Sequence, residues 1–204
     1  MSRTLAAFVR PPIPSVPSVP SVREEIAIES ESGSARSAGP GPGAGRYAVP
    51  VDVHVILRRE GPAGPEVLLT RRAGPVYASG MWHLPSGHLD GPHEDVVRAA
   101  IREAREETGV RLARAGLRAA VTVHHRAPKG SARIGVFFEA EAWQGRPEIT
   151  EPDRCDGMGW FGPDRWPEPM VAYCRAGLTA WLAGDTFAVH FQHPGERVDQ
   201  GPPG

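Results

Sequence analysis

Several features are scarce in this sequence of 204 residues, and each scarcity argues against a class of protein. The two cysteines, Cys155 and Cys174, do not form a CxxC pair, which argues against a zinc site and favours two free thiols over a disulfide. No apolar run reaches the roughly 20 residues that a membrane-spanning helix needs. The formal net charge is −1, so no basic field is present to attract nucleic acid or an anionic membrane. We therefore expect neither DNA binding nor membrane association.

Proline, serine and glycine dominate residues 1–45, which contain repeated Ser-Val-Pro units and a Gly-Pro-Gly-Pro-Gly run. Such a segment buries too little apolar surface to offset its chain entropy, so we predict that it is disordered. The apolar patch at residues 5–9 is too short for a signal peptide, and a cytoplasmic protein is expected. Residues 46–190 are predicted to form one globular domain, followed by a loose tail at residues 191–204.

The pattern of residues 46–190 predicts an α/β fold. Apolar residues alternate with polar ones over residues 51–58, which is typical of a half-buried strand. Further strands are predicted at residues 66–71, 117–125 and 134–143, with a short one ending at Trp160-Phe161 and a short apolar segment at residues 81–84. Helices are predicted at residues 93–108 and 169–183, each followed by a glycine. The order strands, helix, strands, helix predicts a mixed β-sheet with helices packed on its faces.

Three glutamates near the end of the first predicted helix share one face. At 100° per residue, Glu103, Glu106 and Glu107 fall within a sector of about 100°, away from the apolar stripe of the helix. Carboxylates are unfavourable at a helix C-terminus and beside one another. A hard divalent cation with oxygen ligands, such as Mg²⁺, would reverse that balance. Taken alone, a solvated face screened by neighbouring arginines is the simpler interpretation.

The loop before this helix favours the metal site. It reads Leu-Pro-Ser-Gly-His-Leu-Asp-Gly over residues 84–91, and Gly87 could bring backbone atoms close to a metal or a phosphate. Together, residues 84–110 resemble the Nudix box, which reads Gly, five residues, Glu, seven residues, then Arg-Glu-apolar-x-Glu-Glu-x-Gly-apolar. The second half matches at each defined position from Arg102 to Val110. The first half departs, because six residues rather than five separate Gly87 from Glu94.

The resemblance implies an α/β/α sandwich around a mixed β-sheet and a set of functional residues. Glu106 and Glu107 would be the principal metal ligands, and Glu103 a further ligand or the group that orients the attacking water. Arg102 would hold a glutamate in position, and Gly87 could offer its carbonyl oxygen to the metal. The implied metal is Mg²⁺, with Mn²⁺ as a substitute. A general base is often carried by a loop, and the available carboxylates are Glu139, Glu141, Glu151 and Asp153.

Substrate contacts are less specific in the sequence. His124 lies on a predicted strand and could touch substrate, and Trp160 and Phe161 could stack on a nucleobase. The competing interpretation is that one of His124 and His125 is packed and the other solvated, and that Trp160 and Phe161 pack in the core.

The resemblance implies hydrolysis of the diphosphate linkage in a nucleotide, its small-molecule partner. We expect a nucleoside triphosphate, oxidised ones included, cut to monophosphate and pyrophosphate. The alternatives are an ADP-ribose or nucleotide-sugar pyrophosphatase, a non-catalytic nucleotide sensor, and an isomerase of a prenyl diphosphate. A homodimer is an open expectation.

Overall fold

The computed structural model describes residues 48–127 and 130–192. The predicted disordered segment at residues 1–45 lies outside the described residues, as does the predicted tail beyond residue 192. These described residues belong to one compact unit. Neither helix in the described part of this unit is long and apolar enough to cross a membrane.

The described residues form one eight-stranded mixed sheet. Its strands are β1 (Val51–Gly61), β2 (Gly64–Arg72), β3 (Trp82–His83), β4 (Ser86–His88), β5 (Arg118–Arg126), β6 (Ala132–Ala140), β7 (Cys155–Phe161) and β8 (Phe187–Phe191). The order is β3-β2-β1-β6-β5-β8, with β4 paired to β1 and β7 paired to β2. The pairs β1–β6 and β5–β8 are parallel and the other pairs antiparallel, which confirms the predicted mixed sheet.

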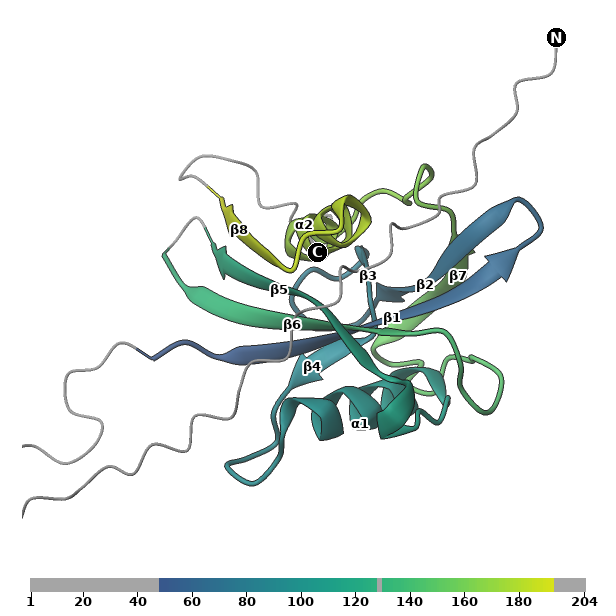
Figure 1. Cartoon of the computed structure of the whole chain (residues 1–204), viewed down its shortest axis with the longest axis horizontal. Coiled ribbons are helices and arrows are strands. Elements are labelled where there is room, and N and C mark those ends of the chain that lie inside the picture. The colour runs from purple at the N-terminus through teal and green to yellow at the C-terminus, as the bar shows by residue number, and fades with distance from the viewer. Residues whose placement is uncertain (1–47, 128–129, 193–204) are drawn as a thin grey trace, which may run out of the picture. The chain divides into compact units, whose positions relative to one another are not determined.

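Two helices cover opposite faces of this sheet, as Figure 1 shows, so the predicted α/β/α sandwich is confirmed. Helix α1 (Val96–Thr108) packs under β1 and β4, and helix α2 (Ala172–Ala183) packs over β5 and β8. A short 3₁₀ helix, Arg114–Gly116, follows α1.

Strand β1 is buried on both faces, although its alternating pattern predicted a half-buried strand. Val53, Val55 and Leu57 pack on the α1 side, with buried helix residues such as Ala100. Ile56 points the other way and joins the core under α2. Asp52 and His54 also lie on this second face and are buried. A central strand between two helical layers has no solvent face, and this places polar side chains in the interior.

Both helices begin three residues later than predicted. Helix α1 begins after Asp95, whose Oδ1 accepts hydrogen bonds from the backbone N–H groups of Val97 (3.0 Å) and Arg98 (2.9 Å). Helix α2 begins late because the chain before it pairs with β3, where the Trp82 N–H donates to the Pro169 carbonyl at 2.9 Å. Gly109 and Gly184 end the two helices in the left-handed conformation, as predicted.

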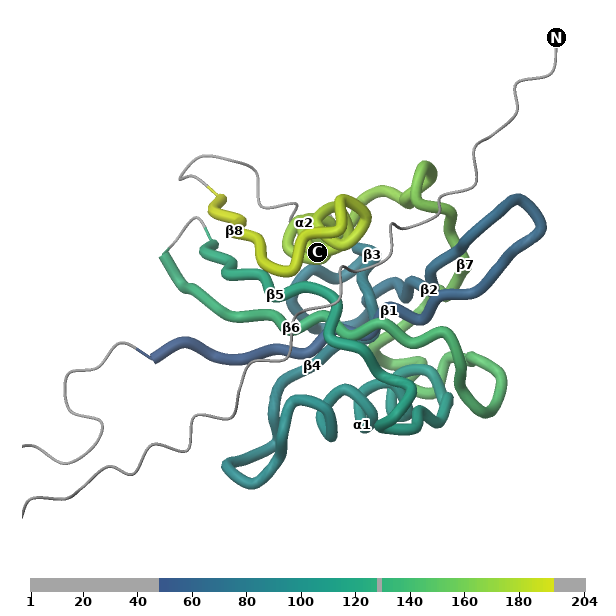
Figure 2. The backbone as a smooth tube through the Cα atoms, in the orientation of Figure 1, coloured from purple at the N-terminus to yellow at the C-terminus, as the bar shows by residue number. Residues whose placement is uncertain are grey.

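Strand β4 and helix α1 are joined by a tight loop that reverses the chain direction (Figure 2). Strand β4 pairs with β1, and Gly87 lies opposite Val53 in this pairing. The extra residue of the box lies beyond β4 and before α1, in the loop between Leu89 and Asp95. The insertion therefore lies outside α1, which packs against β1 and β4.

Candidate active site

A cavity of about 720 Å³ lies where β1, β4 and α1 meet the beginning of α2. Its wall includes Gly87, Arg102 and the glutamate face, which we define as Glu103, Glu106 and Glu107. Its wall also includes a buried polar cluster, which we define as Asp52, His54 and Tyr173. The residues predicted to hold a metal therefore share one cavity with polar groups from the opposite face of β1.

Gly87 allows the closest approach between the loop and the helix. A methyl group on Gly87 would overlap the carboxylate of Glu103. Because glycine has no side chain, the Glu103 carboxylate can lie directly against the backbone of β4. This contact explains why the motif carries glycine here, although the backbone of Gly87 does not need a positive φ.

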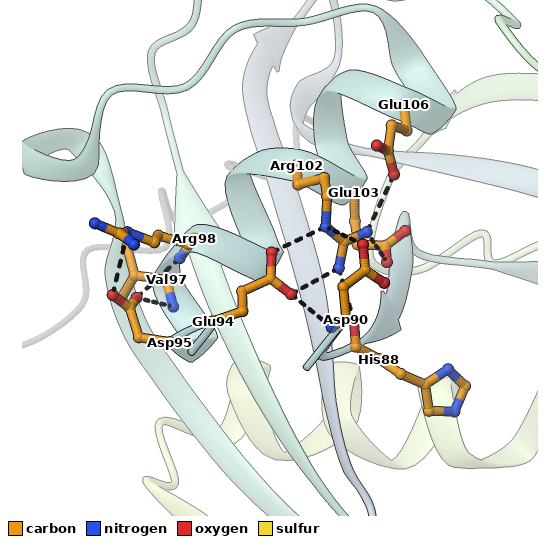
Figure 3. A network of polar contacts seen from close by, with 9 residues as sticks. All are labelled: His88, Asp90, Glu94, Asp95, Val97, Arg98, Arg102, Glu103 and Glu106. Carbon is orange, nitrogen blue, oxygen red and sulfur yellow. Dashed lines mark hydrogen bonds and ion pairs between the residues drawn. The ribbon is translucent and has the colours of Figure 1, made fainter. Parts of the chain in front are cut away.

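Arg102 holds the loop and the glutamate face together (Figure 3). Its guanidinium forms a bidentate pair with Glu94, with Nε–Oε1 and Nη2–Oε2 distances of 2.9 and 3.0 Å. Nη1 donates to Glu103 at 2.7 Å and to Glu106 at 3.1 Å, and Nη2 donates to the His88 carbonyl at 2.8 Å. These carboxylates raise the pKa of Arg102, and its hydrogen bonds lower the pKa of Glu94. Glu94 therefore positions Arg102 despite its altered spacing from Gly87.

Glu107 is partly buried and turns toward β4, where its Oε2 accepts the Ser86 backbone N–H at 3.2 Å. Loss of hydration is the main reason why the pKa of Glu107 is raised to about 8, and the negative charge of Glu103 raises it further. Burial also raises the pKa of Glu103. Two neighbouring carboxylates with poor hydration define a place where positive charge is stabilised.

The residues present fit a divalent cation. The donor set would be carboxylate oxygens of the glutamate face and backbone oxygen near Gly87, the type of ligand that Mg²⁺ prefers. In residues 48–127 and 130–192, no three histidine, cysteine or acidic side chains are already grouped tightly enough to hold an ion.

The buried ring of His83 contacts Ser86, the residue whose backbone N–H binds Glu107. His83 lies between Thr70 and Ser86, with Nε2 3.1 Å from the Thr70 hydroxyl and Nδ1 3.3 Å from the Ser86 hydroxyl. Burial lowers the pKa of His83 well below its ordinary value, so the ring is neutral and can donate from one nitrogen and accept at the other. Sequence analysis did not single out His83, because the signal is a tertiary contact between β2 and β3.

The three residues predicted to contact substrate lie outside the cavity wall. His124 meets the ring of Phe191 edge-on, with centroids 5.3 Å apart. Trp160 stacks on Trp143 with the Arg59 guanidinium 4.0 Å from its ring centroid, and Phe161 packs against Trp82. The cavity is lined instead by His125, the neighbour of His124, because adjacent side chains on a strand point to opposite faces.

Of the four carboxylates considered as a loop-borne base, Glu151 lines the cavity. Glu139 is buried elsewhere, where it pairs with Arg118 and accepts a hydrogen bond from Trp181 Nε1 at 3.1 Å. Glu141 pairs with Arg58 at the surface. Glu151 also raises the pKa of Glu107, which places its charge near the glutamate face.

Known proteins share this fold. The NUDIX domain profile matches residues 48–182. The crystal structure of a MutT NUDIX hydrolase from Burkholderia pseudomallei is 32% identical, has a TM-score of 0.57, and is matched over 65% of this chain and 98% of that one. The MutT protein of Bacillus halodurans has the same TM-score, 0.57, at 19% identity, over 74% of this chain and 95% of that one.

A protein of Bacillus subtilis (strain 168), named as a candidate 8-oxo-dGTP diphosphatase, is 35% identical over 91 residues. The match covers 45% of this chain and 56% of that relative, so the chain spans a little over half of its length. The profile match over most of the chain shows the family directly. The chain belongs to the Nudix family of pyrophosphohydrolases, and its relatives include MutT-like members.

Proposed function

We propose that this protein is a magnesium-dependent hydrolase that cuts a nucleoside triphosphate, oxidised ones included, to a monophosphate and pyrophosphate. The observation that carries the proposal is the single cavity that joins the glutamate face to a buried polar cluster. The triphosphate needs the glutamate face, and the nucleoside needs a site such as the buried polar cluster. Likeness to a MutT NUDIX hydrolase and to a candidate 8-oxo-dGTP diphosphatase supports this choice of substrate.

The glutamate face would hold the metal, with the Gly87 carbonyl as a candidate backbone ligand. Bound Mg²⁺ neutralises phosphate oxygens and lowers the pKa of a bound water, which is the chemistry that diphosphate hydrolysis requires. Arg102 keeps Glu103 and Glu106 in place through the hydrogen bonds described above. Glu151, at the cavity wall, is the carboxylate placed to accept a proton from the attacking water.

Two arginines in the cavity wall are suited to the phosphate chain. Arg72 and Arg154 both line the cavity, and guanidinium groups bind phosphate oxygens through parallel hydrogen bonds. Arg72 is fixed by a hydrogen bond from its Nε to the Tyr77 carbonyl at 2.7 Å, which leaves its other nitrogens to face the cavity. Their positive charge offsets the repulsion between the substrate and the glutamate face.

The test is a substrate panel with wild type and Glu107→Gln. Purified protein is incubated with Mg²⁺ and dGTP, 8-oxo-dGTP or ADP-ribose, and the products are separated by anion-exchange chromatography. We expect pyrophosphate from a triphosphate, and a loss of at least about a hundredfold in kcat for Glu107→Gln, above the 10–100-fold typical of residues behind the ligands. Glu60→Gln, at an exposed site in β1, is the matched control.

Three outcomes would overturn the proposal. Full activity in Glu107→Gln would show that the glutamate face is not the reaction site. Cleavage of ADP-ribose alone would replace the proposed substrate with a nucleotide sugar. Nucleotide binding without turnover of any diphosphate would instead indicate a sensor. The homodimer stays a prediction that size measurement in solution can check.

A further inference from the structure

The buried polar cluster holds hydrogen-bonding atoms that have no partner in the protein. Among the described residues, the buried side-chain nitrogen and oxygen atoms without a hydrogen bond are Asp52 Oδ1, both ring nitrogens of His54, and the Tyr173 hydroxyl. All three residues line the cavity and are more than nine-tenths buried. Native proteins pair nearly all such atoms, because an unsatisfied buried group costs about 1–3 kcal/mol. A concentration of them on one wall indicates a ligand that completes them.

The fold holds these atoms in fixed positions. The His54 ring stacks on Phe137 with centroids 4.2 Å apart, and Tyr173 meets His54 edge-on at 5.1 Å. The other face of the cluster is closed by His125, which stacks on Tyr173 at 4.6 Å. Gly135 lies opposite Asp52 in β6, and a methyl group there would overlap the Tyr173 hydroxyl. The side chains therefore cannot easily turn away to satisfy themselves elsewhere.

The chemistry of the cluster defines its complement. Burial lowers the pKa of His54 to about 3, so its neutral ring offers one N–H donor and one acceptor. The Tyr173 hydroxyl can donate and accept. One oxygen of Asp52 accepts from Arg133 Nη1 at 2.9 Å. The other, Oδ1, lies 3.2 Å from His88 Nε2 without a hydrogen bond to it, and it can receive an N–H donor from a ligand. A neutral heterocycle with neighbouring N–H and carbonyl or ring-nitrogen groups matches this set, whereas a phosphate offers acceptors only.

The cluster lies one strand pair away from the glutamate face. His54 is opposite Ser86 in the pairing of β1 with β4, and the Ser86 backbone N–H is hydrogen-bonded to Glu107. A ligand held at His54 therefore extends toward the glutamates within the same cavity. This placement suits a molecule with a heterocycle at one end and phosphates at the other.

We propose that Asp52, His54 and Tyr173 form the subsite that binds the hydrogen-bonding edge of the substrate's nucleobase and so determine which bases are accepted. The proposal rests on the proposed function for the identity of the substrate. It makes these residues specificity determinants rather than catalytic residues. They act on binding of the nucleoside, and the bond that breaks lies at the glutamate face.

The decisive variant is Tyr173→Phe, which removes one oxygen atom and keeps the ring. The probes are a nucleoside 5′-monophosphate and inorganic tripolyphosphate, titrated by calorimetry in the presence of a chelator. We expect the dissociation constant of the monophosphate to rise roughly three- to tenfold, in line with the loss of one hydrogen bond. Tripolyphosphate, which has no base, should bind equally to both proteins. Thr186→Val, which removes an exposed hydroxyl outside the cavity wall, is the control and should leave both constants unchanged.

A second measurement separates binding from folding. Because the Tyr173 hydroxyl has no partner in the free protein, its removal should leave the melting temperature unchanged or raise it. A lower melting temperature with unchanged monophosphate binding would overturn the subsite and indicate an internal water at this place. His54→Gln provides an independent check, with altered preference among the four nucleoside monophosphates as the expected result. These experiments measure binding and not turnover. They can therefore overturn the proposed subsite without overturning the proposed hydrolase function, and the activity assay can do the reverse.

Discussion

The two regions of the cavity wall differ in how their polar groups are satisfied. On the glutamate face, Arg102 and the Ser86 N–H already bind the carboxylates of Glu103, Glu106 and Glu107. In the buried polar cluster, Asp52, His54 and Tyr173 keep atoms without partners. The first region is charged and partly open to water, and the second is largely neutral and enclosed by aromatic rings.

The difference indicates that the two regions bind their ligands in different ways. Glu106 is half exposed, and an ion pair that is open to water can exchange partners at low cost, so Arg102 can hold this carboxylate until a cation arrives. The groups of the buried polar cluster are more than nine-tenths buried, so leaving them without hydrogen bonds carries an energetic cost. Affinity for a cation and affinity for a heterocycle should therefore respond differently to mutation.

The largest effect should come from Gly87→Ala. The added methyl group would displace the Glu103 carboxylate, which is the mobile end of a side chain, so activity should fall by about a hundredfold with little change in melting temperature. Gly91→Ala is the control, because a side chain at Gly91 would meet no atom within 4 Å. Steady-state kinetics and thermal melts of both variants check this. Equal activity in the two would mean that the close approach at Gly87 has no role.

A smaller effect is expected from Arg102→Met, which keeps the aliphatic stem and removes the hydrogen bonds to Glu94, Glu103 and His88. Activity should fall 10–100-fold, the usual range for residues that orient ligands. The apparent affinity for Mn²⁺, measured by electron paramagnetic resonance, should fall with it. Arg98→Met, on an exposed part of α1, serves as the control. Unchanged Mn²⁺ affinity in Arg102→Met would separate this arginine from the metal site.

The smallest effect concerns stability in acid. The pKa of His54 is about 3 in the folded protein and near 6.5 when unfolded, so between these values the unfolded chain binds more protons. The free energy of unfolding should therefore decrease as pH falls from 7, by up to about 1.4 kcal/mol per pH unit from this residue. Urea unfolding at pH 7, 6 and 5 should show a shallower slope in His54→Gln. An identical slope in variant and wild type would show that folding does not lower the pKa of His54.

The glutamate face was predictable because it depends on local geometry. Spacings of three and four residues place Glu103, Glu106 and Glu107 on one side of any helix. The end of α1 at Gly109 follows from the same local rule. The pairing of Arg102 with Glu94 was harder to predict, because a loop of altered length stands between Gly87 and Glu94.

The buried polar cluster was not predictable from local pattern. Asp52 and His54 alternate with valines, a pattern that predicts a solvent-exposed strand face. They are buried only because α2 covers that face. Tyr173 comes from a helix more than a hundred residues away in the chain. Strand β8 was also not predicted, since its pairing partner β5 supplies the hydrogen bonds that make it a strand. Tertiary neighbours decide these features, and sequence periodicity does not contain them.

The contacts of Arg102 also explain how the loop accommodates an additional residue. The guanidinium bonds to the His88 carbonyl before the insertion and to Glu94 after it, so it fixes the separation of the two loop ends and leaves the path between them free. Variation in length should therefore be tolerated at residues 91–93, where chain may be added or shortened by design. Peptides inserted at that position would lengthen the loop and leave Arg102 and the glutamate face in place.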